Sequence, residues 1–359
     1  MKRYLVKRED LHHNIRLILE KAAGKTVWGV IKGDGYGLGV VNMARELAGQ
    51  GIDHFAVTDV AEVRALRDSG FTGPVLMMSA TAEADTLRQL LELEAIVTVS
   101  SRSDAAAIAA LGWEKPVQAH VKIDTGMGRY GFLPGDLEAL EALYRDYPGI
   151  TFAGIYTHFY NSSEPEPTKA QFAAFTRVVE GLKERGIDPG MVHCCNSSAF
   201  LKYPEMHCDA VRVGSGLLGR VTVGCNTGLK VIGQCQATVE ELRTLPAGHT
   251  VGYGAGWKAR RQTRTAVIPI GYHNGFAVDR GFDLWRLSDC VRGVARYVKA
   301  FLQKKALYVS INGKNCRVLG HVGMVNLVAD VTDCDCAVGD VAEVNINPLV
   351  LKAVPVVFE

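Results

Sequence analysis

The stretch Val27-Trp28-Gly29-Val30-Ile31-Lys32-Gly33-Asp34-Gly35-Tyr36-Gly37-Leu38-Gly39 begins as a short apolar run, reaches a lysine and continues into a turn with four glycines. Such a run is typical of a buried strand in a parallel sheet. A lysine at the end of a buried strand either extends its ammonium group to the surface or serves as an amine nucleophile of the kind that forms Schiff bases. The glycines add weight to the second alternative, because they let the backbone approach a ligand closely. Lys32 considered alone leaves both open.

The regions on either side of this stretch alternate between strand-like and helix-like patterns. Predicted helices lie at 11–22, 40–47, 60–68, 82–93, 103–111, 137–147 and 169–186, with a short one from Ser197. The predicted strands are the one ending at Lys32 and those at 54–57, 74–78, 95–99, 117–123, 151–156, 191–195 and 210–213. Eight strand–helix units of similar length predict an α/β fold with an N-terminal (β/α)8 TIM-type barrel, rather than an open doubly wound sheet.

Polar residues gather just past the ends of these strands, where (β/α)8 barrels carry their active sites. They are Lys32 and Tyr36 after the first strand, Arg129 after the fifth, His158 after the sixth, Asn196 and Ser197 after the seventh, and Arg212 in the eighth. The pattern therefore predicts that these side chains converge on one face of the barrel.

Beyond about residue 225 the sequence becomes rich in β patterns, at 231–242, 265–270, 306–311, 317–322, 326–331 and 341–346. We therefore expect a barrel domain over 1–225 and a mainly-β domain over 226–359. Whether the first few residues pack with the β domain is left open. An extra insertion near 277–305 contains a predicted helix at 287–302. Its Val291, Val294, Val298, Phe301 and Leu302 share one side, and Arg292, Arg296 and Lys299 lie elsewhere.

The composition of the 359 residues is that of a globular protein, with 48% hydrophobic and 22% charged residues. A formal net charge of +2 gives no reason to expect nucleic acid or a membrane as partner. The sequence shows neither an apolar run of membrane-spanning length nor a secretory signal, so a cytoplasmic location is expected. The nine cysteines include no CxxC pair, which predicts reduced thiols and no metal site.

Seven short motifs occur in order along the chain. They are VIKGDGYG at 30–37, VKIDTGMGRYGF at 121–132, THF at 157–159, NS at 196–197, VRVG at 211–214, VGYG at 251–254 and GY at 271–272. With these motifs the chain resembles the alanine racemase family, the fold-type III amino-acid racemases that depend on pyridoxal 5'-phosphate. The resemblance implies a barrel followed by a β domain. It also implies a head-to-tail homodimer in which the partner's β domain completes each active site.

The resemblance further implies two-base racemisation of an amino acid. Pyridoxal phosphate acts as the electron sink, and Lys32 holds the cofactor and serves as the base on one face of the substrate. Tyr253 of the partner subunit would be the base on the other face. Because tyrosine normally titrates near 10, this base would need nearby positive charge. Arg212 resembles the partner of the pyridine nitrogen, and His158 the histidine that links this arginine to the tyrosine.

Other positions match family residues around the cofactor and the substrate. Arg129 would hold the substrate carboxylate or the phenolic oxygen of the cofactor. Lys122 corresponds to a lysine that is often carbamylated, although an ordinary buried lysine remains an alternative. Tyr272 matches a residue at the substrate entrance, and Met324 one beside the substrate. The expected cofactor contacts near the phosphate are Tyr36, Asn196, Ser197, Gly214 and Ser215.

Several positions depart from the family pattern. Asn274 replaces a usual aspartate, Val325 and Asn326 replace Asp-Gln, Phe358 replaces the closing tyrosine, and Val356 replaces an arginine. The loss of these acidic residues predicts a less acidic entrance to the active site. The identity of the substrate is therefore left open. Racemisation of L- and D-alanine is the first expectation, and racemisation of serine or a larger amino acid is the alternative. A related barrel decarboxylase and a non-catalytic cofactor-binding protein are less favoured, because the chain carries Tyr253 and a complete β domain.

Overall fold

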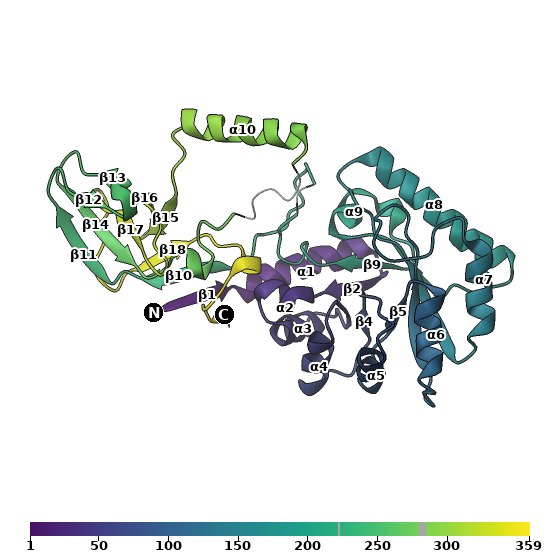
Figure 1. Ribbon diagram of the computed structural model, residues 1–359. Helices are drawn as coiled ribbons and strands as arrows, with labels where there is room; N and C mark the ends of the chain where they lie inside the picture. The colour runs from purple at the N-terminus through teal and green to yellow at the C-terminus, as the bar shows by residue number, and fades with distance from the viewer. Residues whose placement is uncertain (222, 280–284) are drawn as a thin grey trace. The chain divides into compact units, whose positions relative to one another are not determined.

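The computed structural model describes residues 1–221, 223–279 and 285–359 (Figure 1). These residues form two compact units. One consists of Arg8–Ile232, and the other of Met1–Lys7 together with Gly233–Glu359. Within the described ranges, none of the helices has the length and apolar character needed to cross a membrane.

The first unit contains a closed parallel barrel, as the sequence predicted. Its strands are β2 (Thr26–Val30), β3 (His54–Val57), β4 (Val75–Met77), β5 (Val97–Val99), β6 (Val117–Lys122), β7 (Ile150–Tyr156), β8 (Met191–His193) and β9 (Ala210–Val213). They are hydrogen-bonded in the order β4-β3-β2-β9-β8-β7-β6-β5. A parallel bridge between Leu76 and Ile96 joins the two ends of this order. Its hydrogen bonds measure 2.9 Å from Met77 N to Ile96 O and 2.8 Å from Ile96 N to Val75 O.

Helices follow the strands and lie along the outside of the barrel (Figure 1). They are α1 (Arg8–Ala22), α3 (Val40–Ala48), α4 (Val60–Asp68), α5 (Ala84–Glu92), α6 (Arg102–Ala110), α7 (Leu137–Asp146), α8 (Pro165–Glu184) and α9 (Ser197–Lys202), with the single turn η1 (Pro204–Met206). The apolar spacing that predicted the first helix is confirmed, because Leu11, Ile15 and Ile18 are its buried residues. The segment α2 (Lys32–Gly37) is a turn of unusual conformation and belongs to the site.

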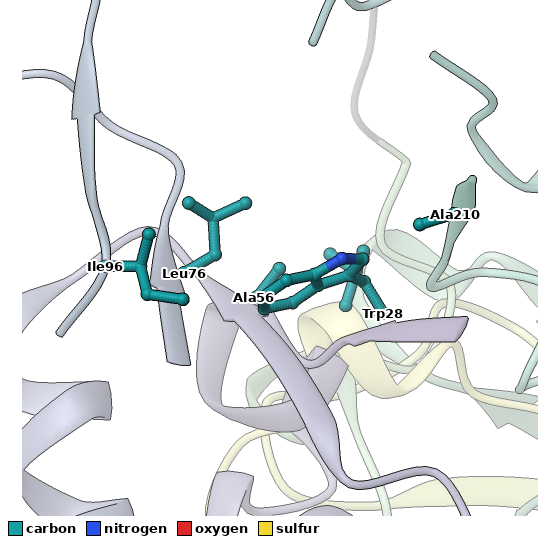
Figure 2. Close-up of a cluster of buried hydrophobic side chains, with 6 residues drawn as sticks. Trp28, Ala56, Leu76, Ile96 and Ala210 are labelled. Atoms are coloured by element: carbon teal, nitrogen blue, oxygen red, sulfur yellow. The ribbon is translucent and has the colours of Figure 1, made fainter. Parts of the chain in front are cut away.

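The interior of the barrel is filled by side chains from several strands. Trp28 packs with Val30, Ala56, Leu76, Ile96 and Ala210 (Figure 2). The indole N–H of Trp28 donates to Sδ of Met191 over 3.3 Å, so its polar atom is also satisfied. These side chains fill the barrel interior, and in barrels of this kind the active site lies at the ends of the strands.

The second unit is mainly β, as predicted, and its main sheet has nine strands. In spatial order they are β11 (Glu241–Leu245), β14 (Thr263–Ile268), β17 (Leu327–Asp330), β16 (Lys314–Leu319), β15 (Tyr308–Ile311), β18 (Val341–Val344), β10 (Gln234–Thr238), β1 (Lys2–Val6) and β19 (Val356–Phe358). The unit also contains the hairpin of β12 (Thr250–Val251) and β13 (Trp257–Lys258), the turns η2 (Tyr253–Ala255), η3 (Tyr272–Asn274) and η4 (Pro348–Val350), and helix α10 (Leu287–Leu302).

The N-terminal residues belong to this second sheet. Strand β1 pairs antiparallel with β10 and parallel with β19. Helix α10 has the predicted bounds of 287–302. Part of the predicted insertion at 277–305, residues 280–284, lies outside the described residues.

The β-rich stretch predicted at 231–242 contains β10 and the start of β11, because the chain turns between them. The turn is held by backbone bonds from Val239 N to Asp340 O, at 2.8 Å, and from Glu240 N to Val267 O, at 2.9 Å. Strand β10 then pairs with β18 and β11 with β14, so the two halves contribute to different parts of the sheet. A continuous apolar pattern does not show such a change of partner.

Candidate active site

A cavity of about 240 Å³ opens where the barrel strands end. Its lining residues are Val30, Lys32, Tyr36, Met78, His158, Asn196, Ser197, Ser198, Arg212, Gly214 and Ser215. Most of the polar residues predicted to converge after the strands do line this one cavity. Chemistry-bearing side chains from β2, β7, β8 and β9 are thus brought to one end of the barrel, as parallel strands require.

A larger cavity, of about 400 Å³, lies among residues that precede the strands, such as Pro74 and Pro116. Its arginine, Arg67, is already engaged by backbone carbonyl oxygens. Arg67 Nε donates to Leu93 O over 2.8 Å, and Nη1 donates to Phe71 O and Gly73 O, each over 2.9 Å. Size alone therefore does not identify the site, and the smaller cavity carries the reactive groups.

The turn after β2 positions Lys32. Gly33, Asp34, Gly35 and Tyr36 all have left-handed backbone conformations, with φ between 51° and 64°. Such a conformation costs roughly 1–2 kcal/mol for each residue other than glycine, so Asp34 and Tyr36 need support from their surroundings. The Glu62 carboxylate gives that support, because it accepts the backbone N–H of Asp34 over 2.8 Å.

Glu62 also belongs to the start of α4. Its carboxylate accepts the N–H groups of Thr58, at 3.0 Å, and Asp59, at 3.2 Å, and it forms a capping box with Asp59. One buried carboxylate therefore ties the turn that carries Lys32 to the beginning of a barrel helix.

Lys32 lies among other cationic groups at this end of the barrel. Burial lowers the pKa of the Lys32 amine, the charges of Arg129 and Arg212 lower it further, and Glu62 opposes them. A lowered pKa gives a larger fraction of neutral amine, which is the form that acts as a nucleophile and as a base. The structure thus provides the environment that the sequence alone could not establish for this lysine.

Tyr36, Ser197 and Gly214 form one wall of the cavity. A β-carbon at Gly214 would come within 2.2 Å of the Tyr36 hydroxyl oxygen, so only glycine allows this approach. The Ser197 hydroxyl oxygen accepts the backbone N–H groups of Gly214, at 3.0 Å, and Gly216, at 3.1 Å. Its own hydrogen stays available for donation to a ligand. Burial raises the pKa of Tyr36 to about 12, which keeps this hydroxyl protonated and able to donate.

Arg212 lies in β9 and is only 2% exposed. Its Nη1 donates to Nδ1 of His193 over 2.7 Å and to His193 O over 3.2 Å. Its Nη2 donates to Thr157 O over 2.6 Å and to Cys194 O over 3.1 Å. Among the described residues, Nε is the nitrogen of this guanidinium that has no acceptor. Arg212 thus keeps one donor in a cavity that it lines.

Two histidines behind Arg212 extend the network. Because arginine only donates, Nδ1 of His193 must accept, which places the His193 ring proton on Nε2. This Nε2 lies 2.9 Å from Nδ1 of His120. Burial and the charge of Arg212 hold the pKa of His193 well below its usual range, and burial lowers the pKa of His120 to about 3. Both rings are therefore neutral at physiological pH.

His193 and His120 are not among the site residues predicted from the sequence. Their signal is their place in the predicted strands 191–195 and 117–123, where a polar residue in an apolar run needs a buried partner. Asn196 is a predicted site residue, and its side chain is already engaged in the fold. Asn196 Oδ1 accepts the N–H of Ala199 over 3.0 Å, at the start of α9, and the Ser162 hydroxyl over 2.9 Å. His158 lines the cavity, and its pKa is lowered well below the usual range by burial and by Arg212.

Lys122, the last residue of β6, is buried, and no carboxylate pairs with it in the part of the chain that the structure describes. Its Nζ lies over two aromatic rings, 5.2 Å from the centroid of Tyr156 and 5.5 Å from that of Tyr130. Burial and the charge of Arg129 lower the pKa of Lys122 to about 7. A larger fraction of the Lys122 amine is therefore neutral near pH 7 than for an exposed lysine.

The loop after β6 that carries Arg129 folds around Asp124. One oxygen of this carboxylate accepts the N–H groups of Gly126, Met127 and Gly128 at 2.9, 2.7 and 3.1 Å. The other accepts the Arg129 N–H at 3.2 Å. Burial alone would raise the pKa of Asp124, but these donors outweigh it and the pKa is lowered. The ionised carboxylate thus fixes the backbone from which Arg129 extends.

Three further predicted site residues lie in the C-terminal unit, and all are exposed there. Tyr253, in η2, has 79% of its surface accessible. Tyr272 and Met324 lie on neighbouring loops, which are joined by backbone bonds from Tyr272 N to Gly323 O, at 3.1 Å, and from His273 N to Met324 O, at 3.0 Å. This unit therefore presents Tyr272 and Met324 together.

Two sequence profiles match most of the chain. The profile described as "Alanine racemase, N-terminal domain" matches residues 6–221, and that described as "Alanine racemase, C-terminal domain" matches residues 232–348. The chain belongs to the alanine racemase family.

Individual members of the alanine racemase family are similar over most of their length. The alanine racemase of Carboxydothermus hydrogenoformans is 32% identical over 335 residues, which cover 91% of this chain and 84% of that protein. The alanine racemase of Desulforamulus reducens is 30% identical over 357 residues, covering 96% and 87%. A solved structure of alanine racemase from Clostridium difficile 630 superposes with a TM-score of 0.83 at 25% identity, covering 99% of this chain and 88% of that one.

Asn274, which the sequence led us to expect in place of a family aspartate, has a structural role. Asn274 is 0% exposed. Its Oδ1 accepts the N–H of Gly271 over 3.2 Å, and its Nδ2 donates to Lys352 O over 3.2 Å. An aspartate could not make the second bond, because an ionised carboxylate has no hydrogen to donate. Asn274 thus holds the η3 turn from a fully buried position.

Proposed function

We propose that this protein is a pyridoxal-phosphate-dependent alanine racemase that works as a head-to-tail homodimer. The observation that carries the proposal is the arrangement around one cavity. Lys32, an amine of lowered pKa, lines the same cavity as Arg212, whose Nε–H has no acceptor among the described residues.

The residues of the cavity fit pyridoxal phosphate. Nε of Arg212 is a donor suited to an unprotonated pyridine nitrogen, because arginine keeps its own proton. The Tyr36 and Ser197 hydroxyls can donate to a phosphate, with Gly214, Ser215 and Asn196 beside them. Lys32 would hold the cofactor covalently. When bound, pyridoxal phosphate supplies the sink for the electron pair left at the substrate α-carbon.

The protein groups would then hold the substrate and move its α-proton. Arg129, on the loop fixed by Asp124, would bind the substrate carboxylate or the phenolic oxygen of the cofactor. Nζ of Lys32 would take or return the proton on one face of the α-carbon. Because the Arg212 guanidinium is held by carbonyl oxygens and by a neutral His193, it would stay protonated and leave the pyridine nitrogen unprotonated. Keeping the pyridine nitrogen unprotonated would limit side reactions.

The second base would be Tyr253 of the partner subunit. Its support is its position in η2 of the C-terminal unit, where the side chain is largely exposed and free to enter a second copy's site. His158 would stand between Arg212 and this tyrosine, and Tyr272 and Met324 would line the substrate side. A carbamate on Lys122 would add a negative charge that orients Arg129.

The test supplies each L-amino acid in turn to the protein loaded with pyridoxal phosphate and follows the circular dichroism of the substrate. Loss of signal with L-alanine is expected. Tyr253→Phe should lower the rate by roughly 10²–10⁴-fold, the usual contribution of a positioned general base, whereas Tyr308→Phe, an exposed tyrosine of the same unit, should not. Inversion of serine or a larger amino acid in preference to alanine would identify that amino acid as the substrate instead of alanine. Cofactor binding without inversion of any amino acid would reject the activity.

A further inference from the structure

Helix α10 has an apolar side that the described residues do not cover. Six large apolar side chains recur at helical spacing and are each 51–81% exposed: Leu287, Val291, Val294, Val298, Phe301 and Leu302. Trp285, just before the helix, is 77% exposed, and Tyr297 beside this side is 63% exposed. Gly293 is the one buried residue of the helix. We call these six side chains the apolar side of α10.

The polar side of the same helix is basic. Arg292, Arg296 and Lys299 lie opposite the apolar side at helical spacing. Residues 285–305 contain six basic residues and one acidic residue, Asp289, in a chain whose net charge is only +2. Asp289 forms an ion pair with Arg292. Asp279 also pairs with Arg296 over 3.7 Å. The segment still keeps an excess of positive charge, which the overall composition does not reveal.

We propose that α10 lies in the surface of an anionic lipid membrane, with its apolar side in the acyl boundary and its basic residues at the headgroups. Interfacial helices combine an apolar face carrying aromatic residues and leucine with a polar face rich in lysine and arginine. Aromatic rings such as those of Trp285 and Tyr297 favour the level of the headgroups. The occupant is an anionic membrane rather than a second copy of the chain, because the basic residues of this segment complement anionic lipid, whereas a second copy would bring the same positive charge.

This inference concerns helix α10 of the C-terminal unit and does not depend on the proposed racemase activity. Attachment by α10 would hold the protein at a bilayer from one side, since the charge attraction and the apolar side act together.

The experiment measures co-sedimentation of the full chain, loaded with pyridoxal phosphate, with vesicles. One set contains phosphatidylcholine alone and the other an equal mixture of phosphatidylcholine and phosphatidylglycerol. We expect binding to the anionic vesicles, falling as salt is raised, and little binding to the neutral ones. The triple variant Arg292→Gln, Arg296→Gln and Lys299→Gln should bind about a hundredfold more weakly, and the double variant Val294→Glu and Phe301→Glu should not bind.

Matched controls lie elsewhere in the same unit. Val338→Glu changes an exposed apolar residue, and the triple variant Arg243→Gln, Arg261→Gln and Arg317→Gln removes the same number of exposed charges. Both should bind like the unchanged protein. The proposal is overturned if the unchanged protein does not bind anionic vesicles, or if the α10 variants bind as well as the controls. A second copy of the chain would be the occupant if the unchanged protein does not bind vesicles and the Val294→Glu and Phe301→Glu variant forms a smaller oligomer by light scattering. That result would also overturn the proposal.

Discussion

Arg212 and His193 share a hydrogen bond of 2.7 Å inside the barrel, in which Nη1 of the arginine donates to Nδ1 of the histidine. The bond requires a neutral histidine, and burial together with the arginine charge keeps the pKa of His193 well below its usual range. The His193 ring is stacked on Tyr156 at a centroid distance of 4.9 Å, which limits its rotation. The guanidinium is thus oriented from behind by groups that do not reach the cavity.

Replacing His193 by phenylalanine should lower the free energy of unfolding by about 1–3 kcal/mol, because a buried donor of Arg212 loses its acceptor. The apoprotein should show this loss in urea unfolding. We also expect weaker binding of pyridoxal phosphate, since the guanidinium is less well oriented.

Tyr144→Phe is the matched control, because its buried hydroxyl has no hydrogen-bond partner among the described residues. Removing that hydroxyl should leave stability unchanged or raise it. Equal losses in the two variants would mean that the bond between Arg212 and His193 does not stabilise the barrel.

Removing the charge of Glu62 and removing the charge of Arg129 should shift the pKa of Lys32 in opposite directions. Glu62 raises the pKa of Lys32 and Arg129 lowers it. Glu62→Gln should therefore shift to lower pH the midpoint at which apoprotein captures pyridoxal phosphate covalently, and Arg129→Gln should shift it to higher pH. The measurement is the rate of capture after borohydride trapping, across a pH series.

Arg145→Gln serves as control for this series, because Arg145 is exposed and pairs with Asp146. It should not move the midpoint. Shifts of the same sign in Glu62→Gln and Arg129→Gln would contradict the electrostatic account of Lys32.

Gly214→Ala should destabilise the barrel by about 1–3 kcal/mol and prevent cofactor binding, because the added methyl group would overlap the Tyr36 hydroxyl. Combining it with Tyr36→Phe should restore part of the stability, since the closest clashing atom is removed. Thermal unfolding of the single and double variants measures the coupling.

Gly135→Ala is the control for the glycine substitution, because a β-carbon there meets nothing within 4 Å. If Tyr36→Phe brings no recovery at all, the contact between Tyr36 and Gly214 is not the cause of the loss.

Lys122→Met should stabilise the apoprotein most at acidic pH. Below the folded-state pKa of about 7 the ammonium is charged in both states, and the folded state carries the cost of burying it. Between about 7 and the unfolded value near 10.4, only the unfolded chain is protonated, so the stability of the unchanged protein rises with pH. The advantage of Lys122→Met should thus be about 2–4 kcal/mol near pH 6 and vanish towards pH 10.

These unfolding measurements use buffers free of carbon dioxide. Adding bicarbonate near pH 8 should then stabilise the unchanged protein and leave Lys122→Met unaffected, as a carbamate on this lysine requires. An advantage that does not vary with pH would show that Lys122 is not a buried cation of lowered pKa.

Much of the fold could be predicted from local patterns. The predicted segments 54–57, 60–68 and 287–302 coincide with β3, α4 and α10. Strands show as apolar or alternating runs and helices as apolar residues with a period of 3.6, and both patterns can be recognised within a short stretch of sequence. The split of 231–242 into β10 and β11 could not be predicted, since it depends on which strands each half pairs with. The left-handed conformation of Tyr36 could not be predicted either, because a residue other than glycine adopts this conformation only when contacts distant in sequence support it.

By itself, the sequence determined the barrel, the β-rich second unit and the set of motifs that marks the family. The alternation of strand-like and helix-like segments and the short motifs are local features of the sequence, so they can be recognised without the fold. The tertiary structure alone decided that the Arg212 guanidinium is held by His193 and Thr157, and that its Nε has no acceptor in the part of the chain that the structure describes. It also decided the lowered pKa of Lys32, which depends on burial and on charges from Arg129 and Glu62. Burial and electrostatic interaction depend on distances in space, and residues far apart in the chain acquire those distances only when the barrel closes.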